Sequence, residues 1–341
     1  MTDGQIPHQT PDQIATAAGT PATATAIGAL RDTGPTAPPT SRARDIWQQL
    51  RKHKGAMFGL TFLMLITFAV LFGSLIWTVD PQKLDIRNKD MRPIYTALWD
   101  ASAKVSWEKP LGSDQLGRDN LAQLLAGGRT SMAVGWSAML LSLFIGTLIG
   151  TLAGYFRRLD GPLMRMTDLF LALPILPLLL LAVTLFRQPL RVAFGPEGGM
   201  FVLIVGIIAL TSWMPTARIV RGDVLAIKER DFVLAARSIG STPAKLIRRH
   251  ILPNILSPIM VSAALGLARA IIEESALSFL GVGFPSDFPT WGKMLADAVV
   301  RMEDFPERVL LPGIAISLTV LSVNYLGDGL RDALDPRIRG R

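Results

Sequence analysis

The sequence ERDFVLAARSIGSTPAKLIRRHILP, residues 229–253, is a polar segment that separates two hydrophobic runs. Its first part, 230–239, is rich in helix-forming residues, and Gly240 stands where a left-handed residue would end that helix. Ser241 or Thr242 can cap a second helix that has Pro243 in its first turn, where a missing N–H is tolerated. The segment therefore predicts a helix, a break and a second helix that ends at Pro253.

The hydrophobic runs on both sides of this segment indicate a membrane protein. Hydrophobic residues make up 50% of the 341 positions and charged residues only 18%, and the mean hydropathy is +0.37, which is too apolar for an ordinary soluble protein. Roughly 18 apolar residues can cross a bilayer core. We expect an all-α membrane protein with six transmembrane helices, at about 56–77, 134–156, 167–186, 200–219, 255–280 and 309–327.

Basic residues are distributed unevenly among the connecting segments. Lys and Arg clearly outnumber Asp and Glu when 41–55, 157–166, 218–253 and 328–341 are taken together, whereas the two signs balance over 79–133, 187–199 and 285–308. Basic residues accumulate on the cytoplasmic side of membrane proteins. We therefore expect both the N- and the C-terminus in the cytoplasm.

The two ends of the chain differ in composition from its centre. Residues 1–40 are rich in Ala, Thr, Pro and Gly, which predicts a disordered cytoplasmic N-terminal tail, and they lack the basic region and apolar core of a signal peptide. Residues 41–55 are basic and contain Trp47 and Leu50, which predicts an amphipathic entry helix on the membrane surface. Residues 328–341 are expected to form a charged cytoplasmic tail.

A turn-rich motif, LGSDQLGRD at 111–119, lies in the long loop between the first two expected spans. Its Gly and Asp residues suit tight turns, and Arg118 can pair with Asp114 or with Asp119. One interpretation is a turn that only satisfies its own polar groups. The other is an outer surface that meets a partner protein or closes a gate.

Two of the expected spans contain small residues or prolines at notable positions. Gly146, Gly150 and Gly154 recur every four residues, which predicts close packing of one helix face against another helix. Pro174 and Pro177 predict a bend in the third span. Such a bend can line a transport pathway or belong to a helix that is merely bent.

Three charged residues lie toward one end of the fifth span. Arg269 and Glu273 are spaced four residues apart and are expected to form an interfacial ion pair. Glu274 lies on a different face of the same helix. It is the candidate residue for a substrate pathway, where it would receive a cationic group such as a peptide amino terminus.

The 229–253 segment resembles the EAA loop of the membrane subunits of ATP-binding-cassette (ABC) importers. The residues in register with that loop are Ala235, Ala236, Gly240, Leu252 and Pro253. Leu234 replaces the family's Glu, and His250 stands where an Ile is usual. The sequence HILPN, 250–254, is similar to the peptide and nickel branch of the family.

Other motifs are similar to the same branch, and the resemblance covers roughly 45–340. The outer-loop motif resembles Gly-Thr-Asp-x-x-Gly-Arg-Asp, with Ser113 for Thr, and its matching residues are Gly112, Asp114, Gly117, Arg118 and Asp119. Residues 279–284 and 291–292 resemble Phe-Leu-Gly-x-Gly and Trp-Gly elements. Residues 324–336 resemble Asn-x-x-Gly-Asp-x-Leu-Arg-Asp-x-Leu-Asp-Pro.

The resemblance implies a type I ABC importer permease fold over 56–327, in the bacterial inner (plasma) membrane. The chain would be the C-type permease of a heterodimer with a homologous second permease. Its other partners would be two cytoplasmic ABC ATPase subunits, which bind ATP and Mg, and an extracytoplasmic substrate-binding protein. Transport of peptides or related solutes would proceed by alternating access. The ATPase-coupling loop would comprise Phe232, Ala235, Ala236, Gly240, Pro243, Leu252 and Pro253.

The sequence argues against several other functions. It contains no Gly-x-x-x-x-Gly-Lys-Ser/Thr and no His-Glu-x-x-His, and its three His and absent Cys leave no His/Cys metal site. We expect no catalytic residue, cofactor or metal in this chain, and no nucleic-acid partner.

Some alternatives stay open. An ion-coupled secondary transporter or channel usually places charges near the membrane midplane, and a membrane scaffold would explain only the hydrophobicity. The 229–253 segment could also rest on lipid headgroups as an amphipathic loop. The substrate could be a dipeptide, an oligopeptide, an opine, a nickel complex or a sugar.

Overall fold

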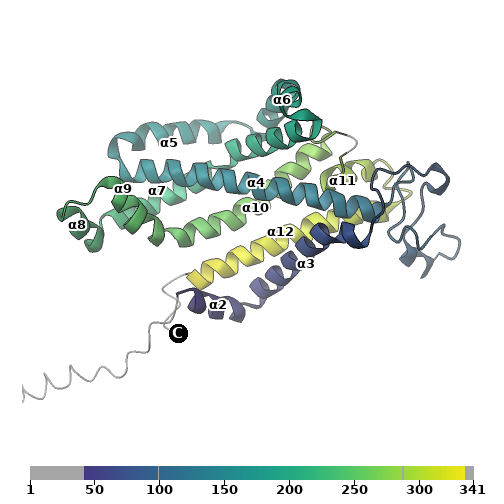
Figure 1. Cartoon of the computed structure of the whole chain (residues 1–341), viewed down its shortest axis with the longest axis horizontal. Coiled ribbons are helices and arrows are strands. Elements are labelled where there is room, and N and C mark those ends of the chain that lie inside the picture. Colours follow the sequence, from purple (N-terminus) through teal and green to yellow (C-terminus); the bar gives the residue numbers. More distant parts are fainter. Residues whose placement is uncertain (1–41, 99, 286–287, 335–341) are drawn as a thin grey trace, which may run out of the picture. The chain divides into compact units, whose positions relative to one another are not determined.

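The computed structural model describes residues 42–98, 100–285 and 288–334. The expected N-terminal tail at 1–40 lies outside these ranges, and of the expected C-terminal tail at 328–341 only 328–334 is described, as the end of helix α12. The described residues are helical, apart from loops and one β-bridge between Ser113 and Asp119 (Figure 1). The helices are α2 (Arg42–Lys52), α3 (Lys54–Ile76), η2 (Ile86–Asn88), η3 (Ile94–Leu98), α4 (Asn120–Tyr155), α5 (Arg157–Ala172), α6 (Ile175–Ser212), α7 (Met214–Lys228), α8 (Asp231–Ser238), α9 (Pro243–Leu246), η4 (Ile247–Ile251), η5 (Leu252–Asn254), α10 (Leu256–Phe279), α11 (Trp291–Val299) and α12 (Pro306–Leu334).

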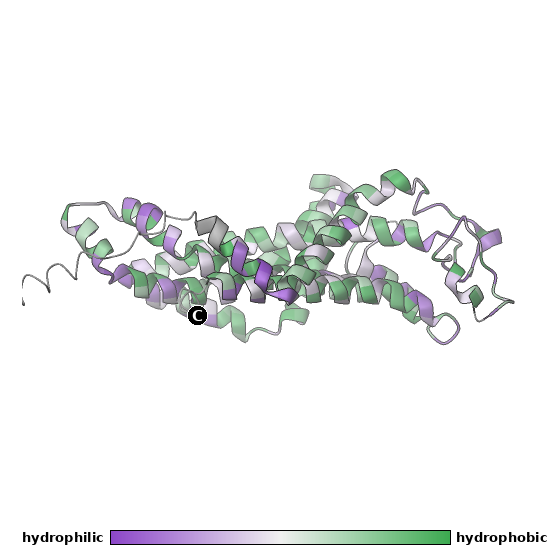
Figure 2. Ribbon diagram, turned by 90° about the horizontal axis from the view of Figure 1, so that it is seen from below, coloured by the Kyte–Doolittle hydropathy of each residue, from purple (hydrophilic) through white to green (hydrophobic). Residues whose placement is uncertain are grey.

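Five of the described helices are long and apolar enough to cross a membrane: α3, α4, α6, α10 and α12. Figure 2 shows hydrophobic residues along much of the length of the long helices. The expected all-helical membrane fold is therefore confirmed. The number of spans differs from six by this measure, because the expected spans 167–186 and 200–219 both overlap α6.

α6 is interrupted at Gly195, whose φ of 78° and ψ of 171° are not helical. A Cβ on Gly199 would clash with the carbonyl oxygen of Leu190, so the backbone comes very close to itself across this break. Only glycine takes such a conformation without strain. The segment therefore consists of two helical parts, 175–194 and 196–212.

The expected bend in the third span is instead a break between two helices. α5 ends at Ala172, and Leu173 takes an extended conformation with ψ 138°, because the proline ring at 174 disfavours a helical residue before it. Pro177 lies in the first turn of α6, where its missing N–H costs nothing. The prediction of one bent helix over 167–186 is wrong for this reason.

α4 packs along α7 at very short range. An added Cβ at Gly146 would lie 2.6 Å from the carbonyl oxygen of Trp213, and one at Gly150 would lie 2.5 Å from that of Ala217. Gly154 meets the side chain of Val224 in the same way, at 2.8 Å. The structure thus places all three glycines of the predicted packing face against α7, where no larger residue fits.

α3, α10 and α12 pack together beside α4. A Cβ on Gly59 of α3 would clash with the backbone of Ser322 of α12. The shared core contains Leu63, Met139, Leu267, Ile271 and Val323. α2 is a helix within the expected entry segment 41–55, but its Leu50 is buried with Ala56 and Ala333 instead of lying on an outer surface.

We predict that Gly150→Ala lowers the stability of the protein, because the new methyl group overpacks the α4–α7 contact at a cost of about 1–3 kcal/mol. Gly222→Ala is the matched control: Gly222 is an exposed helical residue of α7 with no atom within 4 Å of an added Cβ. There the same change raises helix propensity by about 1 kcal/mol. Thermal unfolding of both variants in detergent measures the difference, and equal midpoints would contradict the packing argument.

Candidate functional site

The 229–253 segment forms a helix, a glycine break and a second helical part, as its sequence predicts. Gly240 has φ +85°, and Gly240 N–H donates to Arg237 O while Ser241 N–H donates to Ala236 O. These two bonds satisfy the last carbonyls of α8 in a Schellman arrangement. The second part is less regular than expected, because α9 passes into a π-turn at 247–251 and a 3₁₀ turn at 252–254.

The predicted side-chain cap of the second helix is absent. Thr242 precedes α9 with extended backbone, φ −66° and ψ 152°, but its side chain makes no capping hydrogen bond. Pro243 occupies the first turn as expected. The entry into α9 is therefore set by backbone conformation and by Pro243.

One face of the 229–253 segment is buried and the other is exposed. Val233, Ala236 and Leu246 are buried together, against Tyr155 and Ile227. The small side chain of Ala236 thus serves packing within this chain and is not available to a partner. The predicted coupling residues that are exposed are Phe232, Ala235, Gly240, Pro243 and Pro253, while Leu252 is partly buried.

Ile239 is a surface residue that the sequence analysis did not single out. It is 84% exposed, and Phe232, seven residues earlier, is 46% exposed. Residues seven apart share one face of a helix. The helical spacing of Phe232, Ala235 and Ile239 in the sequence could have predicted this apolar outward face.

Polar contacts join the base of this segment to α4 and α5. Lys228 Nζ donates to the carbonyl oxygen of Gly154 at 2.9 Å. Asp160 on α5 accepts two hydrogen bonds from the guanidinium of Arg221, and this bidentate contact lowers the pKa of the Asp160 carboxyl. The 229–253 segment is therefore attached to a unit formed by α4, α5 and α7.

The outer-loop motif folds around Asp114. Its Oδ1 accepts from the backbone N–H groups of Leu116 and Arg118, both at 2.8 Å. Its Oδ2 accepts from Arg118 Nε at 2.7 Å and from Gln123 at 3.1 Å. Of the two predicted partners of Arg118, the structure selects Asp114.

The two glycines of the motif adopt left-handed conformations, with φ 74° at Gly112 and 76° at Gly117. A Cβ on Gly117 would clash with the backbone of Asp85. Lys109 Nζ donates to both Gly117 O and Asp85 Oδ2, each at 2.8 Å. The hydrogen bond from Lys109 lowers the pKa of Asp85 to about 2.

Asp119 links the loop to α4. Its Oδ1 accepts from Leu121 N–H at 2.8 Å and so caps the first turn of α4. Its Oδ2 accepts from the indole N–H of Trp77, at the end of α3, at 2.6 Å. Burial raises the pKa of this carboxyl above its usual range, while these two hydrogen bonds favour the charged form.

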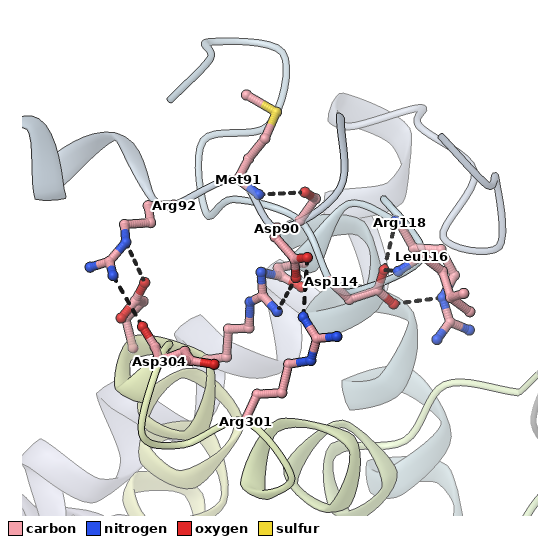
Figure 3. A network of polar contacts seen from close by, with 12 residues as sticks. Asp90, Met91, Arg92, Asp114, Leu116, Arg118, Arg301 and Asp304 are labelled. Carbon is pink, nitrogen blue, oxygen red and sulfur yellow. Dashed lines mark hydrogen bonds and ion pairs between the residues drawn. The ribbon is translucent and has the colours of Figure 1, made fainter. Parts of the chain in front are cut away.

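Asp90 holds the same loop against the connection between α11 and α12 (Figure 3). Its carboxylate accepts from Arg308 at 2.9 Å and from Arg301 at 3.2 Å. Arg92 donates to the carbonyl oxygen of Asp304 at 3.0 Å. Arg308 also lies 3.9 Å from the centre of the Phe305 ring. Residues about 200 positions apart are thus tied together by charge.

Glu274 is completely buried and is not among the residues that line the 660 Å³ cavity described below. Its Oε1 accepts from Ser278 at 2.7 Å, and the hydroxyls of Ser131, Ser275 and Thr290 surround the same carboxyl. Glu273 accepts from Ser212 at 3.0 Å, so the expected ion pair with Arg269 is not formed. The prediction of an ion pair between Arg269 and Glu273 is therefore wrong, while the role of Glu274 stays a prediction.

A cavity of about 660 Å³ lies elsewhere, near the first turns of α4. Its wall is mostly apolar and is built from α3, α4, the second part of α6 and the segment after α10. The lining residues are Val70, Ser74, Pro81, Gln82, Leu125, Ala126, Arg129, Thr130, Ala133, Glu197, Gly198, Phe201, Val202, Phe284, Phe288 and Pro289.

Comparison with known protein families gives two matches along the chain. Residues 143–340 match the family described as binding-protein-dependent transport system inner membrane component. Residues 41–93 match the N-terminal TM domain of oligopeptide transport permease C. Together these matches cover both the region of the 229–253 segment and the entry into the first span.

Characterised relatives match over nearly their full length. The di/tripeptide transport system permease protein DppC of Pseudomonas aeruginosa (strain UCBPP-PA14) is 38% identical, over 88% of this chain and 93% of the relative. The oligopeptide transport system permease protein OppC of Bacillus subtilis (strain 168) is 33% identical, over 87% and 90%.

A solved structure with a similar fold is an inward-facing conformation of the MetNI methionine ABC transporter. It matches with a TM-score of 0.51 and 17% identity, over 62% of this chain and 97% of that chain. At this identity the likeness concerns the fold alone.

We predict that Asp90→Ala loosens the first loop, because it leaves Arg308, which is 8% exposed, without its carboxylate partner. A buried charge that loses its partner costs about 1–3 kcal/mol. Limited proteolysis within 77–119 should become faster than in wild type. Asp80→Ala, whose carboxylate contacts only the nearby backbone of Gln82, is the control, and equal cleavage of both variants would refute a clamping role for Asp90.

Proposed function

The chain belongs to the family of binding-protein-dependent inner-membrane transport components and is a permease subunit of an ABC importer, and from this premise we propose how it works and what it carries. It is a non-catalytic subunit, since ATP hydrolysis in this family belongs to separate ATPase subunits. We propose that its cargo is short peptides, as the names of both relatives suggest. The match to this family of transport components is the observation on which the proposal rests.

The proposed assembly contains this chain, a homologous second permease, two cytoplasmic ATPases that bind ATP and Mg, an extracytoplasmic binding protein and the surrounding lipid. A stripe of exposed apolar side chains on α4 is compatible with a second permease or with lipid. Its large apolar side chains are exposed by 40% at Trp136, 58% at Leu140 and 66% at Phe144. Since α4 is otherwise packed against several helices, either lipid or a second apolar protein surface must cover this stripe.

We propose that the exposed face with Phe232, Ala235 and Ile239 docks on an ATPase. Its opposite face is fixed to Tyr155 at the end of α4 through Val233, Ala236 and Leu246. α4 has 36 residues, so at 1.5 Å per residue it extends about 54 Å from this contact. Movement of the docked segment would carry α4 and α7 together, because their glycine contact allows little sliding. Such a motion would give the transport pathway alternating access to the two sides of the membrane.

The proposed topology has six spans and both termini in the cytoplasm, as the distribution of basic residues predicts. The break at Gly195 supports it, because 175–194 and 196–212 can then cross separately as the third and fourth spans. The 229–253 segment would lie in the cytoplasm. The first loop would lie outside, where it can meet the binding protein.

The experiment that tests this function is reconstitution of the co-expressed permeases and ATPases in proteoliposomes with the binding protein. Peptide uptake should require ATP, and the ATPases should co-purify with this chain. Uptake that runs on an ion gradient without ATP would overturn the proposal and favour the secondary transporter.

Substitution of Gly240 tests the coupling role in the same assay. A left-handed conformation costs a β-branched residue about 1–2 kcal/mol, while an added Cβ meets no atom within 4 Å, so Gly240→Val acts through the backbone. We expect peptide uptake to fall several-fold while ATP hydrolysis continues. Gly240→Asn, which tolerates the left-handed region, should retain most of the uptake. Equal behaviour of the two variants would contradict this role.

The absence of native Cys makes the topology directly testable. Single Cys residues placed at Gln115, Val192 and Thr242, all exposed, can be labelled in intact cells with a membrane-impermeant maleimide. Gln115→Cys and Val192→Cys should react from outside, and Thr242→Cys only after the cells are opened. Protection of Val192→Cys in intact cells would refute two separate spans on either side of Gly195.

A further inference from the structure

The cavity near the first turns of α4 contains two formally charged lining residues of opposite sign. Arg129 comes from α4, and Glu197 comes from the start of the 196–212 part of α6. The other lining residues are apolar or uncharged, among them Phe201, Phe284 and Phe288. Two opposite charges thus open into one mostly apolar space.

Neither charge has a side-chain partner among the described residues. Within the part of the chain that the structure describes, Arg129 and Glu197 form no ion pair and no hydrogen bond, and both are exposed. Arg118, Arg221 and Arg308, by contrast, all contact carboxylates. A charge near apolar surface is favourable only when water, a protein group or a ligand compensates it. The two cavity charges are therefore available to a ligand.

Each residue has a simpler explanation when it is considered alone. Glu197 lies in the first turn of a helical part, where the helix dipole favours a carboxylate. Arg129 could extend toward lipid phosphates. Neither explanation accounts for a cation and an anion on separate elements that share one cavity, and the test below separates them.

We propose that this cavity binds a zwitterionic short peptide, with Arg129 contacting its carboxylate and Glu197 its ammonium group. The inference rests on the proposed importer function and narrows its substrate class. Arginine binds carboxylates through two parallel N–H donors, and the phenylalanines offer apolar contact without selecting a particular side chain. The volume, about 660 Å³, lies within the usual range of roughly 300–1,000 Å³ for ligand pockets. Sugars, which lack both charges, would not use this pair.

The experiment uses the complete permease–ATPase assembly in nanodiscs without binding protein, so that the binding protein's own selectivity does not enter. A tripeptide with free termini and a photoreactive side chain is cross-linked to the assembly. Unlabelled competitors are the tripeptide Ala-Ala-Ala, its C-terminal amide and its N-acetyl form. In wild type, we expect each modification to weaken competition by roughly tenfold, which corresponds to one charge-assisted hydrogen bond.

The variants assign each end of the peptide to one residue. Arg129→Gln should abolish the difference between the free acid and the amide, while the acetyl form remains weak. Glu197→Gln should abolish the difference between the free amine and the acetyl form, while the amide remains weak. Arg191→Gln and Glu303→Gln are matched controls, because these exposed residues lie outside the cavity, and they should behave as wild type.

Other outcomes overturn the inference. If all three competitors act equally in wild type, or if both cavity variants weaken all competitors alike, the charges do not read peptide termini. If both variants show the same pattern of competition as wild type, the two charges do not read peptide termini either. Lipid contact or helix capping is then their role. ATP-dependent peptide uptake by the wild-type system is measured in parallel, so that failure of this inference is distinguished from failure of the importer function.

Discussion

The close contact between α4 and α7 is the constraint on which the rest of the structure depends. Gly146 and Gly150 bring the backbones so close that an added Cβ would lie 2.5–2.6 Å from carbonyl oxygens of the facing segment. Lys228 and Arg221 add polar contacts at the end that carries the 229–253 segment. Interiors packed this closely transmit displacement instead of absorbing it. The segment with α8, together with α7 and α4, therefore forms one mechanical unit, through which the proposed docking on α8 would act on α4.

The charged residues of the chain fall into two groups that differ in their partners. Around the first loop, Asp90, Asp114 and Asp119 each accept two or more hydrogen bonds, and these contacts shape the loop and cap α4. Around the cavity, Arg129 and Glu197 form no hydrogen bond within the described residues, and both side chains are exposed, so water solvates their charges. A ligand can replace that water only when it offers opposite charges of its own.

Much of the architecture could be predicted from sequence because it follows from local rules. The apolar runs located α3, α10 and α12, the glycine spacing found the α4–α7 contact, and Gly240 ended α8 as a left-handed residue should. The environment of Glu274 could not be predicted, because the hydroxyls that surround it come from segments about 140 residues apart in the sequence, at Ser131 and Ser275. The inward orientation of Ala236 depends likewise on Tyr155, which no local pattern reveals.

Two of the predicted span boundaries fall beside the cavity. The second span was expected to begin at 134, but α4 begins at Asn120, because Arg129 interrupts the charge-free run on which the prediction relied. The gap expected between 186 and 200 contains Glu197 and the glycine break, where the helix continues on both sides. A charged residue near the end of an apolar helix lowers the mean hydropathy of the run, so a hydropathy rule ends the predicted span there. The charge-free runs therefore end at the two charges that line the same cavity, whereas the helices that carry these charges continue past them.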